Sequence, residues 1–450
     1  MNLIERIKET KKLLKEQYLA DDRPWVVTFS GGKDSSTVLH LTVEIIEELK
    51  KENKDKKTVY IVSSDTKVEM PVIDKYFFKK LDEIKKYINK NQLNMQVAVV
   101  SPESKDSFWS LLLGKGYPSP NQSFRWCTDR LKIKPATKFL TSLSNNNKSI
   151  LMLLGVRSDE SQTRAASIEK RDRNHRGLVK HDNVPNAFVL SPVKDWSNPE
   201  VWSFLSTYKA PWGSHNDMMK LYDKGSGEAD CNIALNPESP SCGKTRFGCW
   251  VCTVVSKDKS MENMLKNQED YWMKPLHDFR NKLEEYREVD SGKRQSIRRN
   301  GQKGYGPFSM ATRKELFEEL IKIEKDLLDK LNGKYLISDE DIIQIQKEWL
   351  HDGDFFESAI NLANKYGRNI RHESTKAFSN QEQDYFKTLC EENGIQIELM
   401  DKLIQVEHKY RHQLKRSGVF SDIEETVEAY ALGKLNILNF EKRCIIKNAS

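Results

Sequence analysis

Short apolar runs rich in β-branched residues alternate with helical stretches through the first half of this chain. The runs show no polar alternation, which is typical of strands buried on both faces of a parallel sheet. Such strands are predicted at 25–29, 59–62, 95–100, 150–154 and 188–190. Helices are predicted between them, at 34–49, 71–89 and 132–143, where apolar residues recur at helical spacing. This βαβ alternation predicts an α/β fold with a doubly wound parallel sheet and right-handed crossovers.

The pattern changes twice after this α/β part. Asn198 is expected to cap a helix that begins at Pro199, and the α/β part is expected to end near residue 215. The stretch 223–252 holds six Gly or Pro residues, little periodicity and four cysteines. Beyond it, helices are predicted at 260–287, 311–331, 339–351, 381–393 and 397–416. We therefore predict an α/β domain over 1–215, a cysteine-rich segment over 216–258 and a mostly helical region over 259–450.

Charge and cysteine usage narrow the class of protein. The 450 residues carry 73 Lys plus Arg against 66 Asp plus Glu, a net charge of +7, which is too modest for an arm that coats nucleic acid. No signal peptide is recognisable, and no apolar run approaches the roughly 18 residues of a membrane helix. A cytoplasmic protein without membrane contact is expected. Three of the seven cysteines lie between Cys242 and Cys252, which favours a metal centre over a disulfide framework.

A cluster of glycines, hydroxyls and charges separates the first predicted strand from its helix. It reads Ser30, Gly31, Gly32, Lys33, Asp34, Ser35, Ser36. Glycines let the backbone approach an anion, and the start of a helix adds partial positive charge. Lys33 supplies a point charge, and the hydroxyls supply hydrogen-bond donors. The cluster predicts a phosphate-binding loop; the alternative is a glycine turn in which Asp34 caps the helix. It differs from the Gly-x4-Gly-Lys-Ser/Thr loop of other ATPases.

The letters SGGKDS resemble the PP-loop signature of the ATP pyrophosphatases. That resemblance implies an adenine nucleotide alpha hydrolase-like fold, Mg²⁺, and cleavage of ATP between the α- and β-phosphates with AMP left on the substrate. Two later segments are similar to the phosphoadenylylsulfate reductase branch of these enzymes. Asp65 follows the second strand, and Gly155, Arg157 and Arg164 follow the fourth in a GxRxxES-x-x-R pattern. The alternatives are a helix-capping loop at Asp65 and surface Arg–Glu pairs after Gly155.

The resemblance covers roughly residues 20–255 and assigns roles. It implies that the catalytic groups are Lys33, Asp34, Asp65, Arg157 and Arg164. The nucleotide would be bound by the residues of the 30–36 loop together with Asp65, Gly155 and Arg157.

Cysteines in two places match the same branch, where they jointly hold a [4Fe-4S] cluster. Cys249 and Cys252 form a CxxC, and Cys127 stands in a segment that ends at Pro135. Assimilatory reductases carry adjacent cysteines where this chain has Trp126-Cys127, so the resemblance implies that Cys242 supplies the missing ligand, with Cys231 in reserve. The implied set is Cys127, Cys242, Cys249 and Cys252. Four thiolates also suit Zn²⁺, which remains the alternative.

Two segments, 241–255 and 301–310, resemble the DndC family, the PP-loop and iron–sulfur component of bacterial DNA phosphorothioation systems. This resemblance reaches about residue 320. It implies a sulfurtransferase that acts on DNA, with a cysteine desulfurase as sulfur donor and the other subunits of that system as partners. Cys444 lacks the Cys-Gly-Leu-His context of a reductase nucleophile. Reduction of adenylylated sulfate, tRNA thiolation and a non-catalytic scaffold that senses ATP or redox state are the alternatives.

Two basic segments are candidates for contact with DNA phosphates. One lies between residues 291 and 308 and contains Lys293, Arg294, Arg298, Arg299 and Lys303. The other flanks Cys127 and contains Arg125, Arg130, Lys132, Lys134 and Lys138. Contact with phosphates would make binding strongly dependent on salt. The alternative for both segments is a solvated charged face.

Overall fold

The chain divides into two compact units. The computed structural model describes residues 2–158, 178–181, 183–226, 247–296, 298, 302–372, 380–410 and 418–431. One unit comprises Met1–Pro102 and Arg125–Lys274, and the other comprises Glu103–Phe124 and Pro275–Ser450. The second unit is therefore built from two separate stretches of sequence. The three-part division drawn from the sequence stays a prediction.

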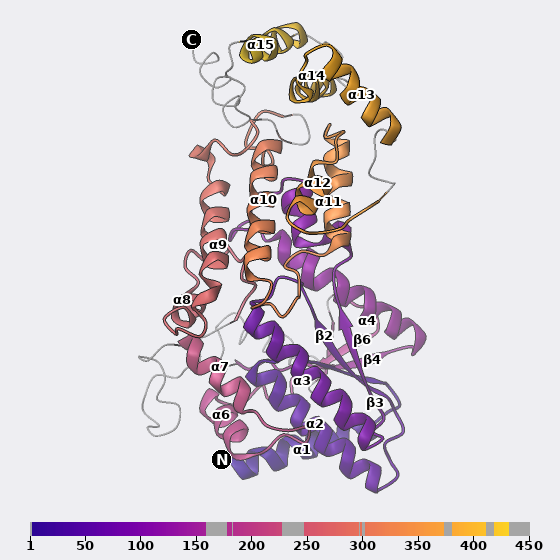
Figure 1. Ribbon diagram of the computed structural model, residues 1–450. Coiled ribbons are helices and arrows are strands. Elements are labelled where there is room, and N and C mark those ends of the chain that lie inside the picture. The colour runs from indigo at the N-terminus through magenta and orange to yellow at the C-terminus, as the bar shows by residue number, and fades with distance from the viewer. Residues whose placement is uncertain are drawn as a thin grey trace. The chain divides into compact units, whose positions relative to one another are not determined.

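A six-stranded sheet forms the centre of the first unit (Figure 1). Its strands are β1 (Trp25–Thr28), β2 (Val59–Ser64), β3 (Met95–Val100), β4 (Ile150–Leu153), β5 (Val179–Lys180) and β6 (Ala187–Leu190). Their order is β3-β2-β1-β4-β6-β5, and only the β5–β6 pair is antiparallel. The predicted α/β fold with a mostly parallel sheet is confirmed.

Alternate residues of the strands pack into two cores, one on each face of the sheet. Val27 faces a core that is covered by helices from both ends of the unit: α1 (Leu3–Leu19), α2 (Lys33–Lys51), α3 (Pro71–Lys90), α6 (Asn198–Thr207) and α7 (Asn216–Ser226). Val26 faces a smaller core under α4 (Lys134–Asn146). Helices on both faces explain why the central strands β1 and β4 are apolar without alternation, since both of their faces are covered.

The start of α6 differs from the sequence prediction. Ser197, not Asn198, is the N-cap, because its hydroxyl accepts a hydrogen bond from the Glu200 N–H and the Glu200 carboxylate accepts one from the Ser197 N–H. This reciprocal capping box satisfies two amides at once, which a single Asn cap does not. Asn198 is instead buried, and its amide oxygen accepts a hydrogen bond from Arg157 at 3.4 Å.

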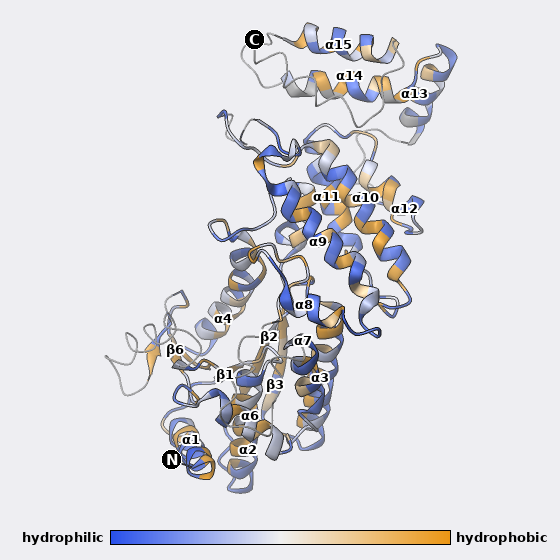
Figure 2. Ribbon diagram, turned by 90° about the vertical axis from the view of Figure 1, so that its left-hand side faces the viewer, coloured by the Kyte–Doolittle hydropathy of each residue, from blue (hydrophilic) through white to orange (hydrophobic). Residues whose placement is uncertain are grey.

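The described part of the second unit is helical, as predicted. Its helices include α9 (Lys274–Arg287), α10 (Met310–Leu327), α11 (Asp339–His351), α12 (Ser358–Lys365), α13 (Asn380–Glu392), α14 (Ile397–Tyr410) and α15 (Val419–Ala431). Figure 2 shows hydrophobic and hydrophilic residues side by side along these helices, as in amphipathic helices that pack on one face. Among the described helices none is long and apolar enough to cross a membrane.

The segment 103–124 supplies part of the core of this helical unit. It contains the short helical turns η1 (Ser104–Asp106) and η2 (Ser110–Gly114). The Trp109 indole donates to the Leu336 carbonyl at 2.9 Å, and the Trp349 indole donates to the Leu113 carbonyl at 2.7 Å. Both tryptophans are fully buried, so these bonds tie the two stretches of the unit together.

Candidate functional site

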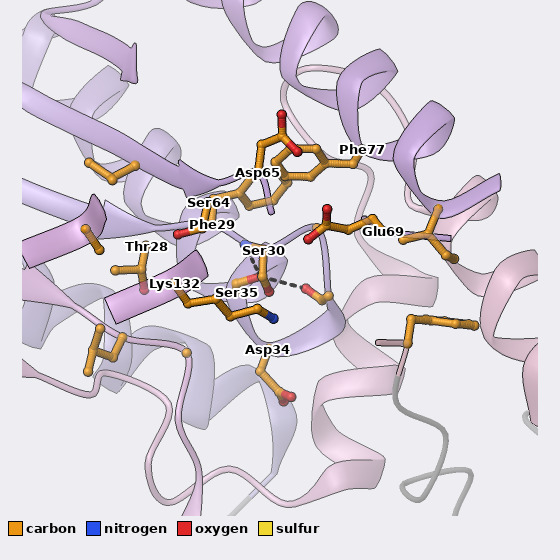
Figure 3. Close-up of a pocket in the computed structure, with 18 of the residues that line it drawn as sticks. Thr28, Phe29, Ser30, Asp34, Ser35, Ser64, Asp65, Glu69, Phe77 and Lys132 are labelled. Atoms are coloured by element: carbon orange, nitrogen blue, oxygen red, sulfur yellow. Dashed lines mark hydrogen bonds between the residues drawn. The ribbon is translucent and has the colours of Figure 1, made fainter. Parts of the chain in front are cut away.

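A cavity of about 830 Å³ opens at the carboxyl ends of β1, β2 and β4 (Figure 3). Thr28, Ser64 and Leu154 mark the three strand ends in its lining. Here the chain order of the strands reverses, because β2 and β3 continue to one side of β1 and β4 lies on the other. Ligands of open α/β sheets bind at such a switch point.

The predicted phosphate loop forms one wall of this cavity. Gly31 has a φ of +75°, which glycine adopts without strain, and its carbonyl accepts a hydrogen bond from the Tyr76 hydroxyl at 3.1 Å. Ser35 closes the loop: its hydroxyl accepts from the Ser30 N–H at 3.2 Å and donates to the Gly32 carbonyl at 3.0 Å. These hydrogen bonds within and to the loop stabilise its shape.

The helix that follows the loop starts beneath the cavity. Its N-cap is Gly32, which has no side chain to cap the first turn of α2. Amides at an uncapped helix start favour an anion, and the helix dipole adds to that preference. The loop and the start of α2 together fit a phosphate chain.

Asp34 and Arg157 form a buried ion pair behind the loop. Arg157 Nε donates to Asp34 Oδ1 at 2.6 Å, and Lys33 Nζ lies 3.3 Å from Asp34 Oδ2. A second nitrogen of Arg157 donates to the Trp196 carbonyl at 3.2 Å. The described residues that line the cavity include Lys33 and Asp34 but not Arg157. Figure 3 shows the Asp34 side chain pointing away from Ser30 and Ser35. The Arg157 guanidinium therefore stabilises the first turn of α2 through Asp34 and does not line the cavity.

Gly155 lies against the loop backbone. A Cβ at this position would be 2.6 Å from the Ser35 nitrogen and 2.7 Å from the Asp34 carbonyl carbon. Both contacts are with backbone atoms, which cannot move aside as a flexible side chain would. Gly155, which the sequence predicted to bind the nucleotide, therefore lets the chain after β4 pack closely against the loop backbone.

Opposite the loop, acidic and sulfur groups gather around the end of β2. Asp65, Glu69 and Cys249 line the cavity, and Figure 3 shows Glu69 pointing toward the loop and Asp65 pointing away from it. Thr66 joins the group, since its N–H donates to Glu69 at 3.2 Å and its hydroxyl lies 3.4 Å from Cys249 Sγ. Burial raises the pKa of Glu69, while nearby Lys132 opposes the rise. A carboxyl, a thiol and an ammonium thus share one wall.

Lys132 reaches the cavity from the segment that follows Cys127. It lies in η3 (Thr128–Ile133), and Figure 3 shows its side chain extending toward Ser35. The same segment therefore carries a predicted cluster ligand at its start and a cationic group in the cavity.

Three of the four predicted cluster ligands are described. Cys252 follows Cys249 in a tight turn, with the Cys252 N–H donating to the Cys249 carbonyl at 3.0 Å. Burial raises the pKa of Cys249 to about 12, and burial also raises the pKa of Cys127. The thiol of Cys252 lies close enough to add to both rises. The fold thus brings Cys127, Cys249 and Cys252 into one neighbourhood.

Within the described residues, no three His, Cys, Asp or Glu side chains are placed so that they could hold one metal ion. The iron–sulfur cluster and its zinc alternative therefore stay predictions from the sequence. The further predicted residues Cys242, Cys231 and Arg164 lie outside the described residues.

The remaining end of the cavity is apolar. Val62, Leu140, Met152 and Leu154 line it between α4 and the sheet. A planar base fits such a surface, whereas a phosphate does not. The cavity therefore has a polar end for phosphates and an apolar end for a base, which is the outline of a nucleotide.

The sequence alone did not assign several of these side chains to a nucleotide site. Tyr76 and Tyr222 flank the loop, and Glu69 and Lys132 face it. Two signals were present in the sequence: Glu69 follows Asp65 closely after the second strand, and Lys132 belongs to the basic segment that flanks Cys127. Tyr222 lies in α7, a helix that the sequence pattern did not predict.

Comparison with known proteins identifies relatives of the α/β unit. A family model described as the phosphoadenosine phosphosulfate reductase domain matches residues 24–255. The uncharacterized protein MJ0066 of Methanocaldococcus jannaschii is 27% identical over 275 residues, which is 61% of this chain and 44% of that protein. The adenosine 5'-phosphosulfate reductase of Salinibacter ruber is 23% identical over 130 residues, or 29% of this chain and 43% of its own. The chain spans about half the length of the curated relatives it matches.

Solved structures show weaker likeness. The U34-tRNA thiolase NcsA from Methanococcus maripaludis, solved with its [4Fe-4S] cluster, has a TM-score of 0.28 and 15% identity, covering 62% of this chain and 80% of that one. Candida glabrata FMN adenylyltransferase has a TM-score of 0.29 and 14% identity, covering 50% and 62%. Scores this low support no inference about ligand or substrate.

Proposed function

Because this chain belongs to the phosphoadenosine phosphosulfate reductase domain family, we propose that it is an ATP pyrophosphatase and sulfurtransferase of the DndC type. In this proposal it replaces a non-bridging oxygen of a DNA backbone phosphate by sulfur. One observation carries the proposal: the phosphate loop and Cys249 line the same cavity. Activation by ATP and delivery of sulfur can then occur at one place.

The first step is transfer of AMP. A non-bridging oxygen of the DNA phosphate attacks the α-phosphorus of ATP, and the bond to the β-phosphate breaks, so that pyrophosphate leaves. Lys33 and the amides at the start of α2 stabilise the charge on the departing pyrophosphate. Mg²⁺ would accompany the nucleotide, and Glu69, whose side chain points toward the loop, supplies a carboxylate of the kind this ion takes. The apolar end at Met152 holds the adenine.

The second step makes AMP the leaving group. A persulfide formed by a cysteine desulfurase attacks the activated phosphorus with its outer sulfur, and AMP departs with the original oxygen. A thiol then reduces the resulting mixed disulfide, which leaves sulfur on the phosphorus. A [4Fe-4S] cluster on Cys127, Cys249, Cys252 and Cys242 would supply a site for the incoming sulfur. Lys132 follows Cys127 in the sequence and extends toward the phosphate loop, so its ammonium group can neutralise charge on the phosphoryl group that is transferred.

Adenylation is tested by the products of ATP. The wild-type protein is expected to release pyrophosphate and to form an AMP-linked species with DNA, and Lys33→Ala is expected to form neither. Radiolabelled ATP and thin-layer separation measure both. Release of ADP in place of pyrophosphate would contradict the first step.

Sulfur transfer is tested by mass spectrometry of DNA. Cys249→Ser is expected to abolish phosphorothioate while ATP binding survives, because the thiol lies opposite the loop. Cys390→Ser is the control, since it makes the same exchange at a cysteine that lies in α13 of the other unit. Phosphorothioate in DNA from cells that make only the Cys249→Ser protein would refute the role of this thiol.

Reduction of adenylylated sulfate is the second candidate, favoured by the similarity to the Salinibacter ruber reductase. Such an enzyme releases sulfite when supplied with adenylylsulfate and reduced thioredoxin. Sulfite production by this chain together with unmodified DNA would favour the reductase. A tRNA-thiolating enzyme would instead place sulfur in RNA, which the same mass spectrometry detects.

A further inference from the structure

Five basic residues lie on a short stretch beside the cavity, between residues 125 and 138. Arg125 precedes Cys127, Arg130 and Lys132 lie in η3, and Lys134 and Lys138 lie in α4. Arg125, Lys132, Lys134 and Lys138 are exposed. The stretch contains one acid, Asp129, which lies 3.5 Å from Arg130. Four of the five basic side chains of this stretch are therefore accessible to solvent.

The basic residues run outward from the cavity. Lys132 lines the cavity itself, whereas Lys134 and Lys138 stand one helical turn apart on the exposed side of α4. The opposite side of that helix is fixed to the sheet by buried Leu140 and Ser144. Four residues of helical rise, about 6 Å, separate the backbone positions of the two lysines along the axis, so both side chains can reach phosphates of one nucleic-acid backbone.

The second basic segment of the sequence is used differently. Lys293 pairs with Glu315 at 2.7 Å, and Arg294 donates to the carbonyls of Gly306 at 2.9 Å and Arg287 at 3.2 Å. These two side chains hold the base of a hairpin in the helical unit. Arg298 and Lys303 remain exposed, and Arg299 lies outside the described residues. The stretch 125–138 is thus the better candidate, because it belongs to the same unit as the cavity.

We propose that Arg125, Lys134 and Lys138 form a basic ridge that binds the sugar-phosphate backbone of a polynucleotide and leads one phosphate to Lys132 in the cavity. This ridge rests on the proposed function, since it assumes that the substrate phosphate belongs to a nucleic acid. Contacts with phosphates fix position without reading sequence, so the ridge accounts for affinity and placement and leaves base recognition to other surfaces.

The test is a salt titration of binding without ATP. A ridge variant, Arg125→Gln/Lys134→Gln/Lys138→Gln, is compared with wild type on a fluorescein-labelled DNA duplex between about 50 and 200 mM salt. Loss of three phosphate contacts is expected to reduce the slope of log K against log[salt] by about 2.7. A control variant, Lys8→Gln/Lys85→Gln/Lys90→Gln, removes the same charge from exposed positions on α1 and α3, which cover the other face of the sheet.

Each outcome decides the proposal. Weaker binding and a smaller slope in the ridge variant alone support it, provided that its thermal melting matches wild type. Equal losses in the ridge and control variants would show only a general charge effect and would overturn it. Wild-type protein that binds neither DNA nor RNA would overturn it as well.

The two proposals fail in different ways. Binding through the ridge without phosphorothioate in DNA would leave the ridge standing and refute the proposed reaction. A parallel titration with tRNA identifies the source of the backbone: ridge-dependent binding to tRNA and not to duplex DNA would keep the ridge and redirect the reaction to RNA. Binding of ATP in the absence of nucleic acid is expected to be unchanged in the ridge variant, because its three side chains do not line the cavity.

Discussion

At position 155 a side chain would meet the backbone of the phosphate loop. Gly155→Ala would place a methyl group 2.6 Å from the Ser35 nitrogen. We expect it to displace the loop, to lower the free energy of unfolding by about 1–3 kcal/mol and to weaken ATP binding at least tenfold. Urea unfolding and calorimetric titration with ATP measure the two effects.

Gly248→Ala is the control for this change. Gly248 also lines the cavity, but a Cβ there would have nothing within 4 Å. Its variant is expected to unfold and to bind ATP as wild type does. Equal effects of the two substitutions would show that the contact with Ser35 is not what matters.

The Asp34–Arg157 pair predicts a second result at the residue scale. Arg157→Gln leaves the buried Asp34 carboxylate without its 2.6 Å partner. Removal of one member of such a pair costs about 3–5 kcal/mol of stability. We expect Arg157→Gln to lose about 3 kcal/mol in urea unfolding, and the double variant Asp34→Asn/Arg157→Gln to recover more than half of it. Lys86→Gln, which breaks the exposed pair with Asp82, is expected to change stability by less than about 1 kcal/mol. A loss of stability in Arg157→Gln no larger than that in Lys86→Gln would show that the Asp34–Arg157 pair does not stabilise the fold.

The same pair shows what the sequence could predict of single residues. The pattern around SGGKDS indicated that Lys33, Asp34 and Ser35 stand at an anion site, and the structure places all three on the cavity. The pattern could not show the surroundings of Arg157, whose guanidinium meets Asp34 and Asn198 from two other elements. Such convergence depends on tertiary packing between residues far apart in the chain.

At the scale of elements, two histidines connect α2 with the residue that directly precedes α7. His40 Nδ1 lies 3.2 Å from His215 Nε2, and both rings are buried. Burial lowers the pKa of His215 from 6.5 to about 3, and the charges of His40 and Lys80 add to the shift. The carboxylate of Glu44 lies 3.3 Å from the other side of His40.

This pair predicts a loss of stability in mild acid. Below pH 6.5 the unfolded chain binds a proton at His215 that the folded chain does not, so acid favours unfolding. Stability from this group is complete above pH 6.5 and falls by about 1.4 kcal/mol per pH unit as the pH drops toward 3. Urea unfolding between about pH 7 and pH 5 measures the slope. His215→Asn is expected to flatten it, and His277→Asn in α9 is not; identical slopes in all three proteins would refute the assignment.

Strong periodicity determined which elements could be predicted. The helix expected at 339–351 matches α11 residue for residue, and the strand expected at 95–100 matches β3. The two-residue strand β5 is too short for any pattern, and α7 ends in a glycine-rich stretch that reads as a loop. Helix α7 forms because Met218 and Tyr222 are buried in the core, which is a tertiary effect.

For the molecule as a whole, the second unit depends on a segment inserted in the first. Trp109, Leu112 and Leu113 are buried, although the rest of their unit begins at Pro275. Each buried side chain of this size contributes about 1.5–3 kcal/mol, and a domain has only about 5–15 kcal/mol in total. A fragment of residues 275–431 is therefore expected not to melt cooperatively.

Restoring the segment provides the check. Fusion of residues 103–124 to the start of that fragment is expected to give a cooperative thermal transition by circular dichroism. The same fusion with Trp109→Ala and Leu112→Ala is expected to lose it. A cooperative transition in the fragment alone would show that the helical unit is complete without the segment.

Topology was the level least accessible from sequence. Alternating strands and helices predicted a parallel sheet, yet the order β3-β2-β1-β4-β6-β5 and the transfer of 103–124 to the helical unit rest on contacts between distant residues. The strand order matters for function, since it puts the phosphate loop at the switch point of the sheet.

Because the second unit is built from two separate stretches of sequence, it cannot fold early during synthesis on the ribosome. The segment with Phe108, Trp109 and Leu111–Leu113 emerges early, but its partners from Pro275 onward are made only after the whole remainder of the first unit. At about 5–20 residues per second, this apolar stretch waits roughly ten seconds or more without its native cover. Nascent chains of this length therefore present a tryptophan- and leucine-rich site to chaperones, and slow translation would lengthen the time in which that site can aggregate.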